Sequence, residues 1–276
     1  MSKHDDPRAK TPKDSHYARL RRTVRDSRRQ QDTARAEQDP DRVLLYGLHT
    51  VRAALDNPAR VPRRLVATRN ALARLGIDEN SALPFTLEIA RPHDIAQLLE
   101  ADATHQGAVL EVRALPRRQL SDLAAGRLVV VLDQVTDPHN VGAIMRSAVA
   151  FGADALITTM RHSPAETGVM AKSASGALEH IPFIPVRNLA EAIGQLHDLG
   201  FFTVGLDSDA TATMEEVMSG HRIALVLGAE GRGLRAKTRS SVKTLARLDM
   251  PGAIHSLNVS NAAAIALYIA ERALRR

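Results

Sequence analysis

Apolar and polar positions follow two periods along the chain, and both begin only after a long polar opening. Residues 1–42 contain few large apolar side chains, chiefly Tyr17, Leu20 and Val24, so this segment has no face to bury. From Val43 onward, short apolar runs typical of strands precede stretches with apolar residues at helical spacing. We therefore predict a disordered tail over 1–42, followed by a folded α/β chain.

The first folded part, residues 43–113, predicts a small α/β unit. It starts with an apolar stretch and a helix that places Val51, Ala54 and Leu55 on one face. A strand around Leu65–Thr68, a strand–turn–helix with Pro92 and Asp94 in the first helical turn, and an alternating strand up to Arg113 follow. Residues 114–126 carry Pro116, two arginines and a terminal glycine, and are predicted to be a linker.

From Arg127 the pattern becomes a regular alternation of strands and helices. The run RLVVVLD, residues 127–133, is continuously apolar, as in a strand buried on both faces. The chain closes with a stretch, Met250 to Tyr268, whose helix is almost uniformly small and apolar, so we expect that helix to be fully buried. This order predicts, over 127–276, a mostly parallel sheet covered on both faces.

Composition restricts the class of protein. The 276 residues are 44% hydrophobic and 25% charged, which is ordinary for one or two soluble domains. Cysteine is absent, which excludes disulfides and cysteine nucleophiles and fits a reducing cytoplasm. A run without charged residues, Met250 to Ala270, contains Pro251, Gly252 and two asparagines, so we expect a buried helix and its leading loop and no membrane span.

The net charge of +6 is concentrated at the start of the chain. Residues 1–42 hold 12 Lys or Arg against 8 Asp or Glu. Such a tail either adds sequence-independent attraction to phosphate backbones or is a solubilising end, and the residues leave both interpretations open.

Three loops that leave predicted strand ends carry unusual polar content, and ligands gather at such ends in parallel sheets. They are Asp133 to Arg146, Leu227 to Leu234, and Leu248 to Asn258. Their glycines match neither a dinucleotide fingerprint nor a P-loop, and the chain has no serine-hydrolase elbow. The scattered histidines have no metal-ligand spacing, so we predict no metal site.

Each loop also has a plain structural interpretation. Ser and Asn before the closing helix are ordinary N-caps, although a helix start also suits an anionic ligand. Glu230 in a glycine-rich turn is ordinarily a solvated acid, and Arg146 on a helix is ordinarily a surface charge. An arginine so placed nevertheless binds phosphate bidentately and keeps its charge.

Taken together, the loops resemble the SpoU-type 2′-O-ribose RNA methyltransferases of the SPOUT superfamily. The matching segments, in the family's order, are DPHNVGAIMRSA, LVLGAEGRGL and SLNVSNAAAIALY. The earlier LLYGLHTVRAAL and THQGAVLEV resemble the small RNA-binding domain, similar to ribosomal protein L30e, of the bacterial 23S ribosomal-RNA branch. Residues 1–42 are outside this resemblance.

The resemblance implies a SPOUT domain with a trefoil knot, a homodimer, and S-adenosylmethionine as the cofactor. Knots are rare exceptions to ordinary fold rules. The residues carried over as lining the cofactor site are Gly228, Leu248 and Leu257. The residues carried over as the catalytic constellation are Asn140, Arg146, Glu230, Ser256 and Asn258. One departure is Met250-Pro251 where a Pro-Met pair is expected, which puts the role of Met250 in doubt.

The implied reaction methylates a guanosine 2′-hydroxyl in 23S ribosomal RNA. Because arginine is always protonated, Arg146 is a poor general base, and we prefer it as a clamp on the neighbouring RNA phosphate. A transfer-RNA 2′-O-methyltransferase and a non-catalytic RNA-binding ribosome assembly factor remain alternatives. With aromatic content of 3%, extensive base stacking is not expected.

Overall fold

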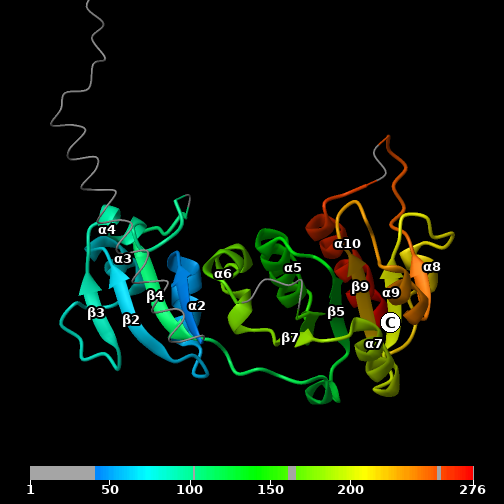
Figure 1. Cartoon of the computed structure of the whole chain (residues 1–276), viewed down its shortest axis with the longest axis horizontal. Coiled ribbons are helices and arrows are strands. Elements are labelled where there is room, and N and C mark those ends of the chain that lie inside the picture. Colours follow the sequence, from blue (N-terminus) through cyan, green and yellow to red (C-terminus); the bar gives the residue numbers. More distant parts are fainter. Residues whose placement is uncertain (1–40, 102, 161–165, 254–255, 276) are drawn as a thin grey trace, which may run out of the picture.

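A computed structural model describes residues 41–101, 103–160, 166–253 and 256–275. The chain forms two sheets side by side, with helices between and around them (Figure 1). The predicted tail over 1–42 falls outside the described residues except for Asp41 and Arg42. Order was predicted to begin near Val43, and the first strand indeed starts one residue earlier. None of the helices described is long and apolar enough to cross a membrane.

The first sheet has four strands in the order β1-β4-β2-β3. β4 runs antiparallel to β1 and β2, whereas β2 and β3 are parallel. Its strands are β1 (Arg42–Tyr46), β2 (Pro62–Ala67), β3 (Thr86–Ile89) and β4 (Ala108–Arg113). Its helices are α2 (Leu48–Asp56), α3 (Arg69–Leu75) and α4 (Pro92–Ala96). Helix α3 was not predicted, although Thr68 caps its first turn and Gly76 ends it with a positive φ of 64°.

The second sheet has six strands, all parallel to their neighbours, in the order β10-β8-β9-β5-β6-β7. Its strands are β5 (Leu128–Asp133), β6 (Ala155–Thr159), β7 (Phe183–Val186), β8 (Phe202–Leu206), β9 (Ile223–Gly228) and β10 (Thr244–Ala246). Its helices are α5 (Pro138–Ala150), α6 (Gly168–Ala174), α7 (Leu189–Asp198), α8 (Met214–Val217), α9 (Ala236–Ser241) and α10 (Val259–Leu274). This confirms the predicted mostly parallel α/β fold; the short α8 was not predicted.

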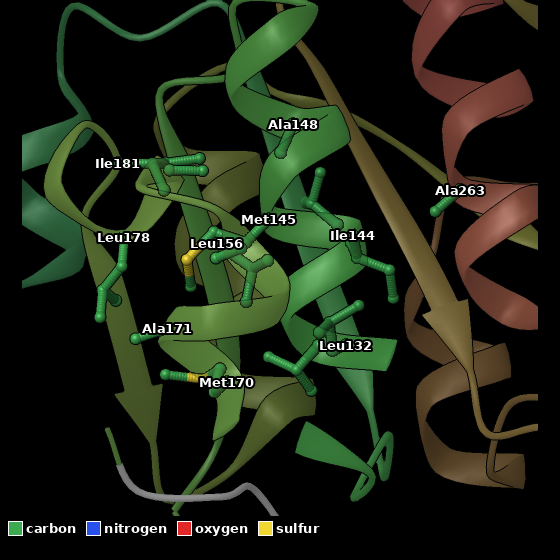
Figure 2. Packing of buried hydrophobic residues seen from close by; sticks show 14 of the residues in the cluster. Leu132, Ile144, Met145, Ala148, Leu156, Met170, Ala171, Leu178, Ile181 and Ala263 are labelled. Atoms are coloured by element: carbon green, nitrogen blue, oxygen red, sulfur yellow. The ribbon is translucent and has the colours of Figure 1, made fainter. Parts of the chain in front are cut away.

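The two faces of strand β5 are both apolar, and helices cover both faces of the second sheet. Its even-numbered residues, Leu128 to Leu132, belong to a core cluster that includes α5, α6 and α10. Its odd-numbered residues, Val129 and Val131, belong to a second cluster with α7. Figure 2 shows the first cluster, where Ile144 and Met145 of α5 pack beside Leu132 and Leu156. A continuous apolar run is therefore required, because neither face of β5 meets water.

Helix α10 differs from the prediction that it is buried all round. Its inner face, which includes Ala263, Ala266 and Leu267, packs against α5 and β9. On its outer face, Ile265 is 43% exposed and Tyr268 is 53% exposed. One face of the helix is therefore buried, while the opposite face meets solvent although it carries apolar residues. Sequence periodicity cannot distinguish such a helix from a fully buried one.

The two sheets are joined through α6 and share one hydrophobic core. Met170, Ala171 and Ala174 of α6 belong to the same buried cluster as Leu45 of β1 and Val51 of α2. Helix α6 packs against β1 so closely that a side chain on Gly168 would overlap the Leu44 carbonyl.

The predicted linker also runs between the two sheets and is partly structured. A 3₁₀ turn, Leu120–Leu123, begins with a reciprocal capping box between Gln119 and Asp122. Its buried leucines join the second core cluster. The linker is therefore held at its end by packing against the second sheet.

Candidate functional site

The loops singled out from the sequence begin at the carboxyl ends of β5, β9 and β10. Strands β5 and β9 are neighbours, and the chain order reverses between them, because β6 and β7 lie to one side and β8 and β10 to the other. A crevice at such a reversal is where open parallel sheets bind ligands. Strand β10 lies two positions away, at the sheet edge, and the chain returns from there to α10 over the centre of the sheet.

Two helix starts meet beside this reversal through a pair of asparagines. Asn258 donates from Nδ2 to Oδ1 of Asn140 at 3.1 Å, and 118 residues separate the two. Asn258 is also the N-cap of α10, accepting from the Ser260 amide at 2.8 Å and its hydroxyl at 2.6 Å. Asn140 lies in the first turn of α5, which Asp137 caps. The structure thus brings together two predicted catalytic residues.

Arg146 is exposed in the middle of α5 and directly follows the buried Ile144 and Met145. Asn140 accepts a hydrogen bond from Asn258, and six residues along a helix place Asn140 and Arg146 on different faces. Within the described residues, the guanidinium of Arg146 has no ion-pair or hydrogen-bond partner. It is therefore available to a ligand.

The loop after β9 is fixed by an ion pair that the sequence analysis did not find. Asp133, with no exposed surface, ends β5 and accepts from the Arg235 side chain at 2.7 Å and from its amide at 3.0 Å. Glu230, which the resemblance places in the catalytic constellation, is exposed and has no partner among the described residues. The available signal was a charged residue at the end of a fully apolar strand, which needs a partner when buried.

Gly228 is required by the same loop. The chain turns back after β9, so that the Gly233 amide donates to the Ala229 carbonyl at 2.9 Å. A Cβ on Gly228 would overlap the backbone of Gly233 and Leu234. A side chain at position 228 would therefore collide with the loop itself.

The third loop contributes one buried and two exposed residues. Leu248 is 9% exposed and belongs to the core cluster. Leu257 is 39% exposed, an unusual position for leucine in a polar loop, and Ser256 beside it is exposed. His255, in the same polar stretch, lies outside the described residues.

The arrangement combines a free guanidinium, an amide pair at two helix starts, a folded glycine loop and an exposed leucine. Helix starts favour anionic or polar groups, and arginine favours phosphate oxygens. No cluster of three His, Asp or Glu side chains fit to hold a metal occurs in the described part of the chain. The site is suited to an anionic polymer and a ligand that is partly apolar.

Two family models match the chain, each over one of the sheets. The model described as the SpoU rRNA methylase family matches residues 127–268. The model described as RNA 2′-O ribose methyltransferase substrate binding matches residues 44–118.

Curated relatives match over most of their length. A 23S rRNA (guanosine-2′-O-)-methyltransferase of Burkholderia sp is 37% identical over 241 residues, covering 83% of this chain and 96% of the relative. The protein of the same name from Vibrio cholerae is 36% identical over 246 residues, with the same two coverages.

Solved structures share the fold. The SpoU methyltransferase AviRb from Streptomyces viridochromogenes, in complex with the cofactor AdoMet, superposes with a TM-score of 0.71 at 23% identity, over 84% of this chain and 90% of that one. An AdoMet-bound rRNA methyltransferase from Sinorhizobium meliloti gives a TM-score of 0.73 at 23% identity, over 88% and 91%.

Proposed function

The chain belongs to the SpoU rRNA methylase family, and we propose that it transfers a methyl group from S-adenosylmethionine to the 2′-hydroxyl of a guanosine in 23S ribosomal RNA. The observation that carries this proposal at the site is the solvent-exposed Arg146, without a partner among described residues, on the helix that starts at the Asn140–Asn258 pair. The full-length match to relatives named for this reaction supports the choice of substrate.

The residues at the strand reversal fit S-adenosylmethionine. The exposed Leu257 offers apolar surface for an adenine ring, while the exposed turn from Glu230 to Gly233 offers polar backbone. Leu248 belongs to the core cluster and Gly228 packs against the Gly233 backbone, and both complete this proposed cofactor site. When bound, the cofactor supplies an electrophilic methyl group on a sulfonium.

The residues of this chain then have positioning and electrostatic tasks. A sugar hydroxyl is a weak nucleophile until it loses its proton. Arg146, which stays protonated, clamps a phosphate of the RNA and stabilises the negative charge that develops on the ribose oxygen. The proton passes to that phosphate or to water. Asn140 and Asn258 fix the two helix starts against each other, and Ser256 and Glu230 contact the RNA or the opposite loop.

A second copy of the chain completes the site. Ile265 and Tyr268 form an exposed apolar outer face on α10. An apolar face of this kind is covered in oligomers, which supports the homodimer implied by the family. The return of the chain from edge strand β10 to α10, which packs on α5 and β9, supports the trefoil knot implied by the family.

The domain limits follow the same proposal. Residues 43–113 form the L30e-like RNA-binding domain, 114–126 the linker and 127–276 the methyltransferase domain, preceded by a basic tail over 1–42. Two separate sheets and two family matches support this division. A substrate in the ribosome implies that the protein acts in the cytoplasm.

The proposal is tested with purified protein, radiolabelled S-adenosylmethionine and protein-free 23S ribosomal RNA. Labelled RNA, with the methyl group mapped to one guanosine ribose, is the expected result. Labelling of transfer RNA alone would favour the transfer-RNA alternative. Tight RNA binding with no transfer, and no rise in melting temperature on adding the cofactor, would favour the non-catalytic assembly factor.

A further inference from the structure

A cleft of about 920 Å³ lies between the two sheets, away from the loops just described. It is lined by the first strand, the linker, and the segment from Leu178 to Pro185, which contains parts of η2 (Ala177–Glu179) and β7. None of the residues of the loops after β5, β9 or β10 lines it. The linker crosses from β4 to β5 along this side of the molecule (Figure 1).

Two of the acidic side chains that line the cleft, Glu166 and Glu179, are paired with the buried Arg60. The side chain of Arg60 has no exposed surface and forms ion pairs with Glu166 and with Glu179, the latter at 2.6 Å. Glu166 also accepts from the Leu115 amide at 3.1 Å, and Glu179 accepts from the Asn57 side chain at 2.7 Å. These carboxylates are turned toward partners, so they oppose an approaching anion only weakly.

The rim of the cleft, in contrast, carries three arginines that have no ion-pair partner among the described residues. Arg113, Arg117 and Arg118 are all exposed and all line the cleft. The free acid facing them from the rim is Asp41. The charge available to a ligand is therefore positive.

The backbone beneath these arginines is held at both ends. The Arg113 carbonyl accepts from Arg60 at 3.1 Å, and the Ala114 amide donates to the Asp41 carbonyl at 2.7 Å. Beyond Arg118, the capping box at Gln119 starts the 3₁₀ turn. Guanidinium groups on an anchored segment lose less freedom on binding than groups on a flexible one.

The cleft also holds an aromatic ring. Phe183, at the start of β7, is half-buried and lines the cleft. Aromatic rings bind unstacked bases, and arginines bind the phosphates between them. This combination favours RNA over an acidic polypeptide, which has charge but no bases.

We propose that the cleft between the two sheets binds a single-stranded segment of the RNA substrate, with its phosphates on Arg113, Arg117 and Arg118 and a base against Phe183. The inference rests on the proposed RNA methyltransferase function and adds a second contact region to it. The cleft guides the RNA from the small sheet along the linker, while the chemistry takes place at the β5–β9 reversal.

The test compares two variants of the full chain with equal change in net charge. Arg117→Glu/Arg118→Glu reverses two rim charges, and Lys237→Glu/Lys243→Glu reverses two exposed charges on the α9 side, at the opposite edge of the six-stranded sheet. The probe is a fluorescent mixed-sequence single-stranded RNA of about 20 nucleotides, titrated at several salt concentrations.

The rim variant should bind this RNA at least tenfold more weakly, and its salt slope should shrink by about 0.7 for each lost phosphate contact. The control variant should lose much less, and both should keep the parent melting temperature and cofactor affinity. Equal weakening of RNA binding in the two variants would overturn the proposal. So would a competition experiment in which polyglutamate displaces the labelled RNA as effectively as unlabelled RNA does. Because binding is measured without transfer, a failure of methylation alone would count against the proposed function and leave this inference standing.

Discussion

The junction between the two sheets and the loops at the β5–β9 reversal use arginine in opposite ways. At the junction, Arg60 is buried and gives its donors to two carboxylates and a carbonyl. At the reversal, Arg146 stands in solvent without a partner among described residues. A buried charge has to be satisfied within the chain, whereas an exposed one is free to bind a ligand. The contrast separates residues that hold the molecule together from residues that serve its substrate.

The largest effect on stability is expected at the junction. Arg60→Met should lower the free energy of unfolding by about 3–5 kcal/mol, because it leaves two carboxylates buried without their cation. Urea unfolding followed by circular dichroism measures this. The control is Arg74→Met on α3, an exposed arginine with no ion pair among the described residues, which should change the free energy by less than about 0.5 kcal/mol.

A second variant tests whether the loss of stability comes from the two unpaired carboxylates. Adding Glu166→Gln and Glu179→Gln to Arg60→Met removes the stranded charges and should recover part of the loss. If Arg60→Met unfolds at the same urea concentration as the Arg74 control, the junction does not depend on its ion pairs, and the contrast drawn above is wrong.

The next effect is expected on catalysis. Arg146→Ala should slow methyl transfer about 10²–10³-fold, since under the proposed mechanism it removes the positive charge that stabilises the developing oxyanion. Cofactor affinity by calorimetry and the melting temperature should both stay at the parent values, because the side chain is exposed. Arg146→Lys keeps the charge but not the bidentate geometry, so it should restore the rate only partly. A fully active Arg146→Ala protein would remove this residue from the mechanism.

The smallest effect is expected at Asn258, which both caps a helix and lies among the predicted catalytic residues. Asn258→Ala removes the N-cap of α10 and should cost about 1 kcal/mol of stability. Asn258→Asp keeps an acceptor for the Ser260 amide but cannot donate to Asn140. The aspartate variant should therefore keep the parent stability while slowing transfer. Equal stability of the alanine variant and the parent would show that the cap contributes nothing.

Local pattern predicted most of the fold. The apolar run of β5, the alternation after Arg127 and Pro92 at the start of α4 are local signals, and each element formed as expected. Helix α3 was not predicted, although the residues that cap it, Thr68 and Gly76, are equally local signals in the sequence.

The contacts that define the two regions are not local. Arg60 lies 106 residues from Glu166 and 119 from Glu179, so no periodicity near Arg60 reveals its partners. The Asp133–Arg235 pair spans 102 residues, so the sequence showed Asp133 only as the start of a polar loop. The roles of Asn140 and Asn258 came from family resemblance, and their hydrogen bond is consistent with that grouping.

The position of α10 also bears on how the protein is made. Helix α5 leaves the ribosome long before α10, because 118 residues separate Asn140 from Asn258. In the folded protein, however, α10 covers α5 and β9. Until then the apolar surface of Ile144 and Leu225 has no cover from α10, and such long-range closure is slow and prone to aggregation. The nascent chain therefore has the greatest need of chaperones in the interval between the synthesis of β9 and the docking of α10.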